Sequence, residues 1–153
     1  MKKLILFGAV LSLALACCQS SPAQDRGAWY AASNSATSIT GDMIIGDGRI
    51  TIDFMNFPLA QIRALEPAEV GAVFDADSNA GAKGNLYRLR VPAAQRFLHH
   101  NTLCASEDTQ WMATYVEGKT LHVALFSGPS MPVFTFDALS HSNDLCGTFT
   151  YTR

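Results

Sequence analysis

Residues 111–127 read WMATYVEGKTLHVALFS, and this stretch decides the fold class. Two runs rich in aromatic and β-branched residues, 111–116 and 120–127, flank the tripeptide Glu117-Gly118-Lys119. Such runs favour β-strands, and a glycine between them supplies the positive φ that tight hairpin turns need. The stretch therefore predicts a β-hairpin.

A second hairpin is predicted upstream. Residues 39–45 are rich in apolar side chains, and residues 49–54 alternate apolar with polar ones. The runs are joined by Gly46-Asp47-Gly48, a sequence typical of turns. The alternation places three apolar side chains on one face: Ile50, Ile52 and Phe54.

Four more strands and two helices complete the pattern. The strands are expected at residues 70–74, 86–91, 132–136 and 145–152. The third begins with a proline, which is tolerated at a sheet edge. A helix is expected at 57–65, where Leu59, Ile62 and Leu65 recur every three residues, and another at 92–100, which begins with proline.

Seven or eight short strands separated by turn signals are typical of a mostly antiparallel sheet. We therefore expect a mainly β fold: a small antiparallel β-barrel or sandwich with one or two short helices. The chain of 153 residues is long enough for one domain with a substantial core, expected over residues 29–153.

Residues 1–16 have the pattern of a secretory signal peptide. Lys2 and Lys3 precede an apolar run over residues 4–16, which ends in small residues. The run is shorter than the about 20 residues that a membrane-spanning helix needs, and no later stretch is long enough. We expect an exported protein.

The sequence Leu13-Ala14-Leu15-Ala16-Cys17 resembles the lipobox of bacterial lipoproteins, although that motif usually has leucine where Ala14 stands. The resemblance implies lipidation of Cys17, a linker over residues 17–28 and a membrane-anchored lipoprotein on the periplasmic side of the envelope. Cleavage after Ala16 or Ala23 without lipidation is the alternative. Cys18 has no assigned role in either case.

Composition excludes several partners. Without Lys2 and Lys3, nine of the eleven basic residues stand against thirteen acidic ones, a net charge of −4. The sequence has no basic patch for nucleic acid or anionic lipid, and Gly41, Gly46 and Gly48 lack the spacing of a phosphate loop. We expect no cofactor and no nucleic acid. The expected partners are the membrane, through the lipid anchor, and an envelope or secreted protein.

Cys104 and Cys146 are the two cysteines of the domain itself. In an oxidising compartment they are expected to form a disulfide, because export makes that the default state of paired cysteines. The bond would join positions 42 residues apart and stabilise the fold by about 4 kcal/mol in the chain-entropy account.

His99 and His100 are the candidate catalytic residues. Adjacent histidines point in different directions on a helix or a strand, so they do not easily bind one metal ion together. The fold would have to bring a carboxylate, or His122 or His141, beside them. The alternative is a helix-end role, in which a histidine contacts free carbonyl groups.

Asp75, Asp77 and Asn79 are the candidate metal ligands. Their spacing resembles the first half of a calcium loop, but an EF-hand needs glycine where Ala80 stands and an acidic residue where Leu86 stands. A weak calcium site of another kind and an ordinary turn are both open interpretations.

Aromatic side chains are available either to line a ligand cavity or to fill the core. They include Trp29, Trp111, Tyr115, Phe134, Phe149 and Tyr151. Some barrels bind a small ligand in such an interior, but in a domain this small we expect most of these side chains to pack the core. The loops at 75–85 and 128–132 are the alternative docking sites for a partner.

Residues 96–104 (RFLHHNTLC), 110–115 (QWMATY) and 145–151 (LCGTFTY) resemble a recurring set in a group of uncharacterised exported bacterial proteins. The resemblance covers most of the chain after Ile39 and implies no particular activity. In size, lipobox, hairpins and cysteine pair the chain is also similar to small lipocalin-like barrels and to periplasmic lysozyme or protease inhibitors, which is an analogy of fold alone.

The leading hypothesis is a non-enzymatic envelope binding module. It would hold a protein, as an inhibitor does, or a small apolar ligand. The inhibitor form predicts a protruding loop, and the ligand form predicts an apolar cavity. The alternatives are a small hydrolase or metal-dependent enzyme that uses His99 or His100, and a structural envelope lipoprotein.

Overall fold

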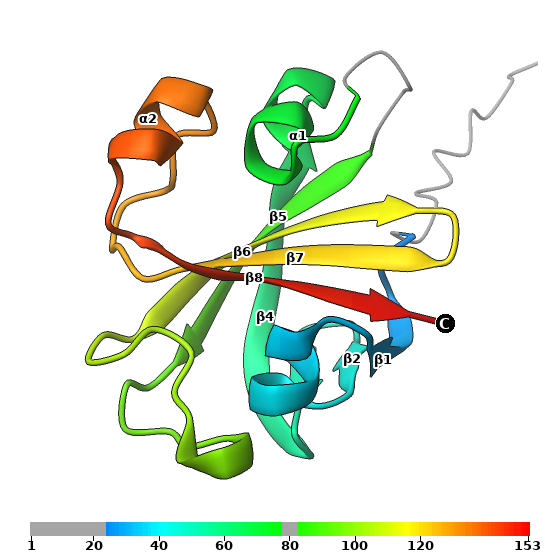
Figure 1. The fold of residues 1–153 in the computed structure, drawn as a ribbon, viewed down its shortest axis with the longest axis vertical. Coiled ribbons are helices and arrows are strands. Elements are labelled where there is room, and N and C mark those ends of the chain that lie inside the picture. Colours follow the sequence, from blue (N-terminus) through cyan, green and yellow to red (C-terminus); the bar gives the residue numbers. More distant parts are fainter. Residues whose placement is uncertain (1–23, 78–82) are drawn as a thin grey trace, which may run out of the picture.

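The computed structural model describes residues 24–77 and 83–153, in which eight antiparallel strands close into a barrel (Figure 1). They are β1 (Gly27–Ala31), β2 (Met43–Ile45), β3 (Arg49–Ile52), β4 (Met55–Leu65), β5 (Gly84–Val91), β6 (Thr109–Glu117), β7 (Thr120–Phe126) and β8 (Leu145–Thr152). Each strand pairs with the next in the sequence, and β8 pairs with β1. The predicted mainly β fold is confirmed, as a barrel and not a sandwich. The signal sequence, Cys17, Cys18 and Asn79 lie outside the described residues.

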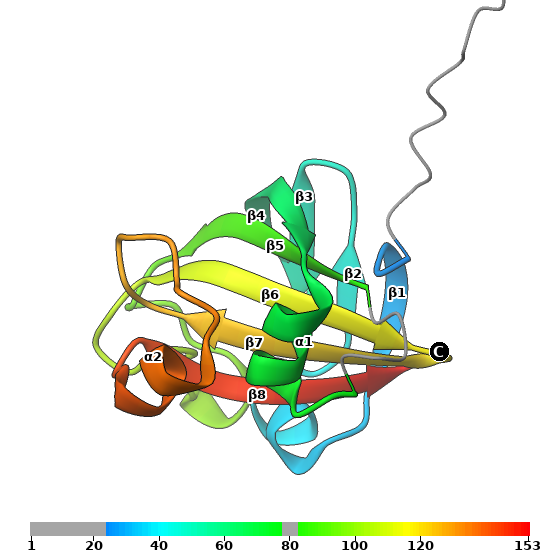
Figure 2. The same ribbon diagram turned by 90° about the horizontal axis from the view of Figure 1, so that it is seen from above.

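The described part of the chain also includes short helical segments. They are η1 (Ala36–Thr40), α1 (Pro67–Phe74), η3 (Leu98–His100) and α2 (Phe136–His141), where η1 is a π-helical turn and η3 a 3₁₀ turn. Figures 1 and 2 show α1 and α2 on the outside of the barrel wall, away from β1 and β2. None of the helices among the described residues is long and apolar enough to cross a membrane.

The barrel interior is packed with side chains. Alternation along each strand sends every second residue inward, and these residues form one core cluster. Its largest fully buried members are Trp29, Met43, Ile45, Ile50, Ile52, Tyr87, Met112, Leu121, Leu125 and Tyr151. Side chains fill the interiors of small eight-stranded barrels in this way.

A second apolar cluster covers the outer face of β5, β6 and β7. It joins side chains of these strands to Val70 of α1 and to Phe134, which precedes α2. The members from β5–β7 are Leu86, Trp111, Ala113, Tyr115, Ala124 and Phe126. The strands β6 and β7 are therefore buried on both faces, whereas β2 and β3 keep an outer face that is open to solvent.

The β6–β7 hairpin is confirmed. Glu117 pairs with Thr120, so the turn consists of Gly118, with a φ of 58°, and Lys119. The terminal strand β8 is confirmed as well. Its alternation places two aromatic side chains in the core: Phe149 and Tyr151.

The segment predicted as a helix at 57–65 belongs to strand β4, so that prediction is wrong. A bulge between Gln61 and Arg63 shifts the register between β4 and β5. Leu59, before the bulge, packs in the barrel core, whereas Leu65, beyond it, packs in the outer cluster. The bulge hides the two-residue period of the strand, and the remaining three-residue spacing imitates a helix.

The strand predicted at 70–74 is also wrong, because these residues belong to helix α1. Pro67 occupies the first turn, where the missing N–H would have no partner in the helix. Glu66 and Glu69 form a capping box, and the Glu69 carboxylate accepts the Glu66 N–H at 2.8 Å. Arg63 of β4 donates to the same carboxylate at 2.7 and 2.8 Å.

Two more predicted elements are wrong. The helix expected at 92–100 is a series of turns that ends in η3, and this path carries Phe97 into the barrel core. The strand expected at 132–136 is an unpaired segment that buries Phe134 in the outer cluster before α2 begins. In both segments the irregular path of the chain buries an aromatic ring.

The N-terminal part of the domain differs from the prediction in two details. The strand expected at 39–45 begins only at Met43, because η1 occupies its first two residues. The linker was expected at 17–28, but β1 begins at Gly27 and the side chain of Asp25 is already buried. The barrel therefore includes residues that the sequence pattern assigned to the linker.

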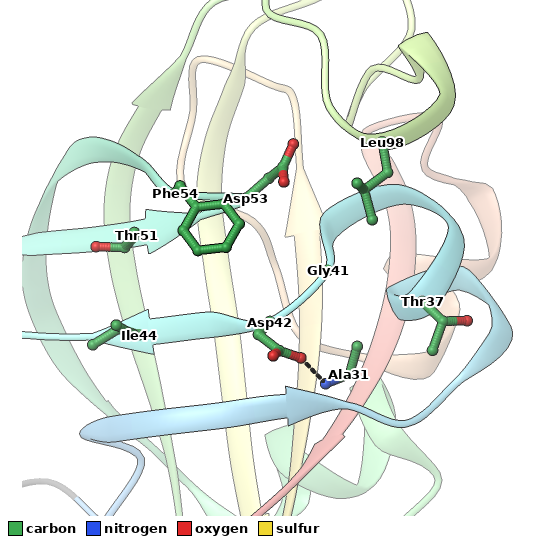
Figure 3. Close-up of a pocket in the computed structure, with 9 residues that line it drawn as sticks. All are labelled: Ala31, Thr37, Gly41, Asp42, Ile44, Thr51, Asp53, Phe54 and Leu98. Atoms are coloured by element: carbon green, nitrogen blue, oxygen red, sulfur yellow. Dashed lines mark hydrogen bonds between the residues drawn. The ribbon is translucent and has the colours of Figure 1, made fainter.

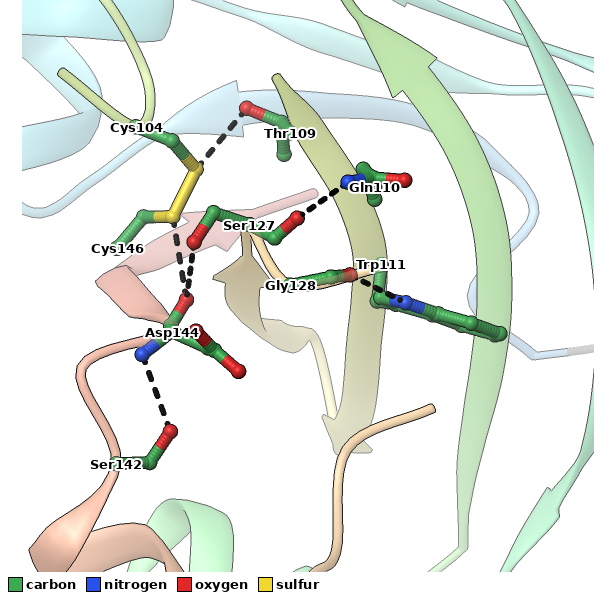
Figure 4. The surroundings of a disulfide bond; sticks show 9 residues. All are labelled: Cys104, Thr109, Gln110, Trp111, Ser127, Gly128, Ser142, Asp144 and Cys146. Carbon is green, nitrogen blue, oxygen red and sulfur yellow. Dashed lines mark hydrogen bonds between the residues drawn. A yellow bond between two sulfur atoms is a disulfide. The ribbon is translucent and has the colours of Figure 1, made fainter. Parts of the chain in front are cut away.

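The predicted disulfide between Cys104 and Cys146 is confirmed (Figure 4). It joins the loop before β6 to strand β8. The Thr109 hydroxyl donates to Cys104 Sγ at 3.1 Å, and the Gln110 amide donates to the Ser127 carbonyl at 2.8 Å. These contacts fix the ends of β6, β7 and β8 against one another.

Candidate functional site

The outer face of the β2–β3 hairpin carries a groove. Ile44 of β2 pairs with Thr51 of β3, and both lie outside the barrel core that their neighbours form. Two hollows meet at this pair, one of about 410 Å³ toward the β3–β4 turn and one of about 440 Å³ toward the β2–β3 turn. We call the two together the hairpin groove. The hollow toward the β3–β4 turn, which we call the Phe54 hollow, is lined by Ala31, Thr37, Gly41, Asp42, Ile44, Thr51, Asp53, Phe54 and Leu98 (Figure 3).

Phe54 stands at the tip of the β3–β4 hairpin. Ile52 pairs with Met55, so the turn consists of Asp53 and Phe54 alone, with φ values of 46° and 63°. Two positive φ values in a two-residue turn are typical of a type I′ turn, which favours asparagine and glycine. An aromatic residue in this region is strained, by about 1–3 kcal/mol.

The Phe54 side chain is 95% exposed. The sequence pattern placed it on the buried face of the strand with Ile50 and Ile52, and that prediction is wrong for Phe54 alone. The strand ends at Ile52, and the turn directs the ring outward, beside the Phe54 hollow. The chain therefore holds a large apolar ring in solvent on a strained but tightly defined turn.

The opposite wall of the Phe54 hollow comes from η1 and η3. Gly41 has a φ of 60° and a ψ of −158°, a backbone conformation that is essentially confined to glycine. A Cβ atom there would lie 3.3 Å from Leu98 Cδ1. His99 Nδ1 and the Asn101 amide both lie within hydrogen-bond distance of the Ser38 carbonyl, at 3.1 and 3.2 Å. These bonds hold η3 on η1 and fix Leu98 in the wall.

Two carboxylates, those of Asp42 and Asp53, line the Phe54 hollow. Asp42 Oδ1 accepts the Ala31 N–H at 2.9 Å, which ties β1 to the start of β2 (Figure 3). Asp53 makes no hydrogen bond or ion pair with any residue in the ranges 24–77 and 83–153. No lysine or arginine is among the residues that line this hollow.

The predicted catalytic histidines lie at the edge of this region but without acid partners. His99 and His100 are exposed, and both have positive φ values instead of ending a regular helix. No hydrogen bond or ion pair joins either ring to a carboxylate within the described residues. In the same residues no group of three or more His, Cys, Asp or Glu side chains could hold a metal ion. The structure gives His99 a positioning role, through Ser38.

The other two histidines also lie elsewhere. His122 stacks on Tyr115 with ring centroids 5.5 Å apart, and burial lowers its pKa. His141 lies at the end of α2, with Nδ1 3.6 Å from Asp137 Oδ1. The fold therefore does not bring the four histidines together.

The predicted metal ligands Asp75 and Asp77 follow α1. Asp75 ends the helix with a φ of 54°, a left-handed cap conformation that aspartate tolerates. Both side chains are exposed. Burial, followed by the negative charges of Glu117 and Asp77, raises the pKa of Tyr115, which packs near this end of α1. Since Asn79 lies outside the described residues, the proposed calcium ligands are not placed together.

Asp25 is a site residue that the sequence pattern missed. Its side chain is 1% exposed and lies inside one end of the barrel. The carboxylate accepts hydrogen bonds from the Tyr87 hydroxyl at 2.9 and 3.0 Å, from the Asn85 amide at 3.1 Å and from the Thr114 hydroxyl. These donors all point inward from β5 and β6. Burial and the charge on Asp25 raise the pKa of Tyr87, so its hydroxyl stays a neutral donor.

The C-terminus helps to hold Asp25 in place. The Trp29 indole N–H donates to the Asp25 carbonyl at 2.7 Å. The Arg153 guanidinium lies 4.2 Å from the centre of the Trp29 ring and donates to the carbonyls of Gln24 and Arg26. β1 and β8 share only two residue pairs, so these side chains strengthen a short closure of the barrel.

A second exposed apolar surface surrounds α2. It includes Met131, Val133, Phe136 and Leu145. A hollow of about 210 Å³ lies beside it, lined in part by Pro132 and Leu139. This is the region that the sequence suggested as a docking loop at 128–132. Phe136 is 79% exposed, and helix α2 lies on the opposite side of the barrel from β1 and β2 (Figures 1 and 2).

Comparisons with known proteins do not add a function to this geometry. The chain was compared with protein-family models, with curated proteins and with solved structures. It matches no family model, no curated protein and no solved structure.

Proposed function

We propose that the protein is an exported binding module that holds a protein partner at the hairpin groove. The observation that carries this proposal is Phe54, an aromatic ring that is 95% exposed on a strained two-residue turn beside an apolar hollow. A relaxed turn would place asparagine or glycine there. A strained residue of this kind is a reason to infer function, because its strain brings no gain in stability to the isolated fold.

Phe54 has the properties of an interface anchor. Aromatic side chains bury about 150–250 Å² each and dominate interface energies. The turn is held by the β3–β4 pairing on both sides, so little conformational freedom is lost when a partner covers the ring. Ile44, which is 49% exposed, extends the apolar surface along the hairpin.

The packed interior favours a protein partner over a small apolar ligand. The core residues fill the barrel, and Asp25 and its donors occupy one end. The hollows described above lie on the outer surface of the barrel. The hairpin tip also offers what an inhibitor uses, an exposed apolar side chain on a tightly held turn. The export and periplasmic location in this proposal rest on the N-terminal sequence.

The test compares two exposed phenylalanines. Protein with wild-type sequence, with Phe54→Ser or with Phe136→Ser is used to capture partners from an envelope extract, and each captured protein is purified and titrated. We expect a partner whose Kd rises about 30-fold or more for Phe54→Ser, as for an interface hot spot. The Phe136→Ser protein should bind within twofold of the wild type.

Three results would oppose the proposal. Equal binding by all three proteins would remove the role of Phe54. Loss of partner binding with Phe136→Ser alone would place the binding site on the surface around α2. If no captured protein binds in purified form, the structural envelope lipoprotein becomes the better explanation.

A further inference from the structure

The Phe54 hollow is lined both by apolar side chains and by two carboxylates. Asp42 directly precedes β2 and Asp53 directly follows β3, and the last pair between these strands is Met43 with Ile52. The two residues therefore lie at the same end of the hairpin, where the Asp42 carboxylate turns toward Ala31 of β1 and the Asp53 carboxylate turns away from it (Figure 3). Both line one hollow, and two negative charges that line one hollow repel each other.

No cation of the described chain relieves this repulsion. The hollow has no basic lining residue, and the nearby Arg26 is paired with Asp47 at 3.4 Å, at the other end of the hairpin. One oxygen of Asp42 accepts the Ala31 N–H, which leaves its second oxygen directed at no described donor. A ligand cation beside Phe54 would meet two carboxylates that have no basic partner.

The other end of the groove has a different charge. Arg49 and Thr51 share the outward face of β3, because alternate residues of a strand point the same way, and Asp53 follows in the turn. Arg49 lines the hollow at the β2–β3 turn and Asp53 lines the Phe54 hollow. Four steps along the backbone separate the two residues, which is about 13 Å in an extended chain. The groove is thus acidic beside Phe54 and carries an arginine toward the β2–β3 turn.

The closed barrel also limits how a partner can bind. Every described strand has a neighbour on both sides, so the hairpin offers no free strand edge for an added strand. A partner must lie across the outer face and be recognised by its side chains. Apolar contact with Phe54 and Ile44 then provides affinity, and charge decides which segment fits.

We propose that the hairpin groove binds an extended protein segment that carries a lysine or arginine next to an apolar side chain. The basic group enters the Phe54 hollow, which Asp42 and Asp53 both line, and the apolar neighbour packs on Phe54. An acidic residue about four positions along the segment faces Arg49. This inference rests on the proposed function and adds the chemistry of the partner.

The test uses random linear 12-residue peptides displayed on phage and selected on the full-length, disulfide-bonded protein. Synthetic versions of the enriched peptides are titrated by fluorescence anisotropy against the wild type, Asp53→Asn, Asp42→Asn, Phe54→Ser and Phe136→Ser. We expect a basic residue next to an apolar one in the enriched set. Asp53→Asn should weaken binding about fivefold, and added salt should weaken it further. Phe136→Ser should leave binding unchanged.

The outcomes separate this inference from the function on which it rests. Two results would overturn the proposal of a cationic segment while the proposal of a binding site at Phe54 stands. In the first, the enriched peptides need Phe54 but lack a basic residue, and in the second, they bind Asp53→Asn and the wild type with equal affinity. If no enriched peptide depends on Phe54, both proposals fail. The variant Asp53→Lys gives a reciprocal check, because it should select acidic peptides in place of basic ones.

Discussion

The hydroxyl of Tyr87 donates to the buried carboxylate of Asp25, 2.9 Å from Oδ1 and 3.0 Å from Oδ2. This contact joins the first described turn of the chain to the middle of strand β5. Asn85 and Thr114 complete the set of side-chain donors, all of them neutral. A buried carboxylate without such donors would be very unfavourable, so the four side chains act as a unit.

Replacing Asp25 should therefore destabilise the barrel strongly. Asp25→Ala leaves three polar groups without their acceptor, two of them buried and Asn85 half-buried, and we expect a loss of about 2–4 kcal/mol in the free energy of unfolding. Tyr87→Phe removes one donor of three and should cost less, about 1–2 kcal/mol. Urea denaturation measures both. Asp47→Asn is the control, since that side chain is 91% exposed. Ordinary surface substitutions change the free energy of unfolding by at most about 0.5 kcal/mol. If the free energies of unfolding of Asp25→Ala and of the control differ by less than this, the network has no structural role.

The same network predicts instability in alkaline solution. Burial and Asp25 raise the pKa of Tyr87 above its ordinary value of 10, and burial raises the pKa of Tyr151. Above about pH 10 the unfolded chain loses these protons while the folded chain keeps them. The unfolded state then binds fewer protons, so stability is complete below pH 10 and falls as the pH rises. The slope is at most about 1.4 kcal/mol per pH unit for each tyrosine.

The measurement is the urea midpoint between pH 8 and pH 11 for the wild type, Tyr87→Phe and Tyr151→Phe. Each substitution should make the alkaline fall shallower. Slopes that do not differ among the three proteins would show that these phenols ionise in the folded state.

Phe54 should lower the free energy of unfolding of the protein while it supports partner binding. Phe54→Gly relieves a positive-φ strain of about 1–2 kcal/mol, partly offset by the greater freedom of glycine in the unfolded chain. We expect a net gain of about 0.5–1 kcal/mol together with loss of partner binding. Phe54→Ala is the matched control, because it removes the ring and keeps the strain. It should lose binding without a gain in stability. Equal stability of the two variants would contradict the account of the turn.

The disulfide should contribute several kcal/mol. Joining Cys104 to Cys146 closes a loop across 42 residues, so the double variant Cys104→Ser with Cys146→Ser should lose about 4 kcal/mol. The wild type in reducing agent should show a similar loss in urea denaturation. Reducing agent should leave the double variant unchanged. A wild type that is equally stable with and without reductant would contradict this prediction.

The sequence predicted the elements in which local pattern and tertiary role agree. The β6–β7 hairpin has strand formers on both sides of Gly118, and β8 alternates strictly, so both were predictable. The cysteine pair followed from the expectation of export. Local rules failed at β4, where the bulge near Gln61 reverses the faces, and at α1, where Pro67 begins a helix that the pattern had ended before it.

The candidate site was less predictable for a related reason. The pattern over residues 49–54 continues the alternation into Phe54, and only the pairing of Ile52 with Met55 shows where the strand ends. The Asp42–Asp53 pair and the Asp25 network depend on register between segments distant in the sequence. One signal was available: Asp53-Phe54 sits between two apolar runs, a spacing that suits a two-residue turn.

Photo-cross-linking from position 54 tests the central claim most directly. The full-length protein, with p-benzoylphenylalanine in place of Phe54 or of Phe136, is expressed in its native cell and irradiated. The account predicts a discrete cross-linked protein from position 54 and none of that mass from position 136. The same product from both positions, or products from position 136 alone, would contradict the assignment of the hairpin groove as the binding site.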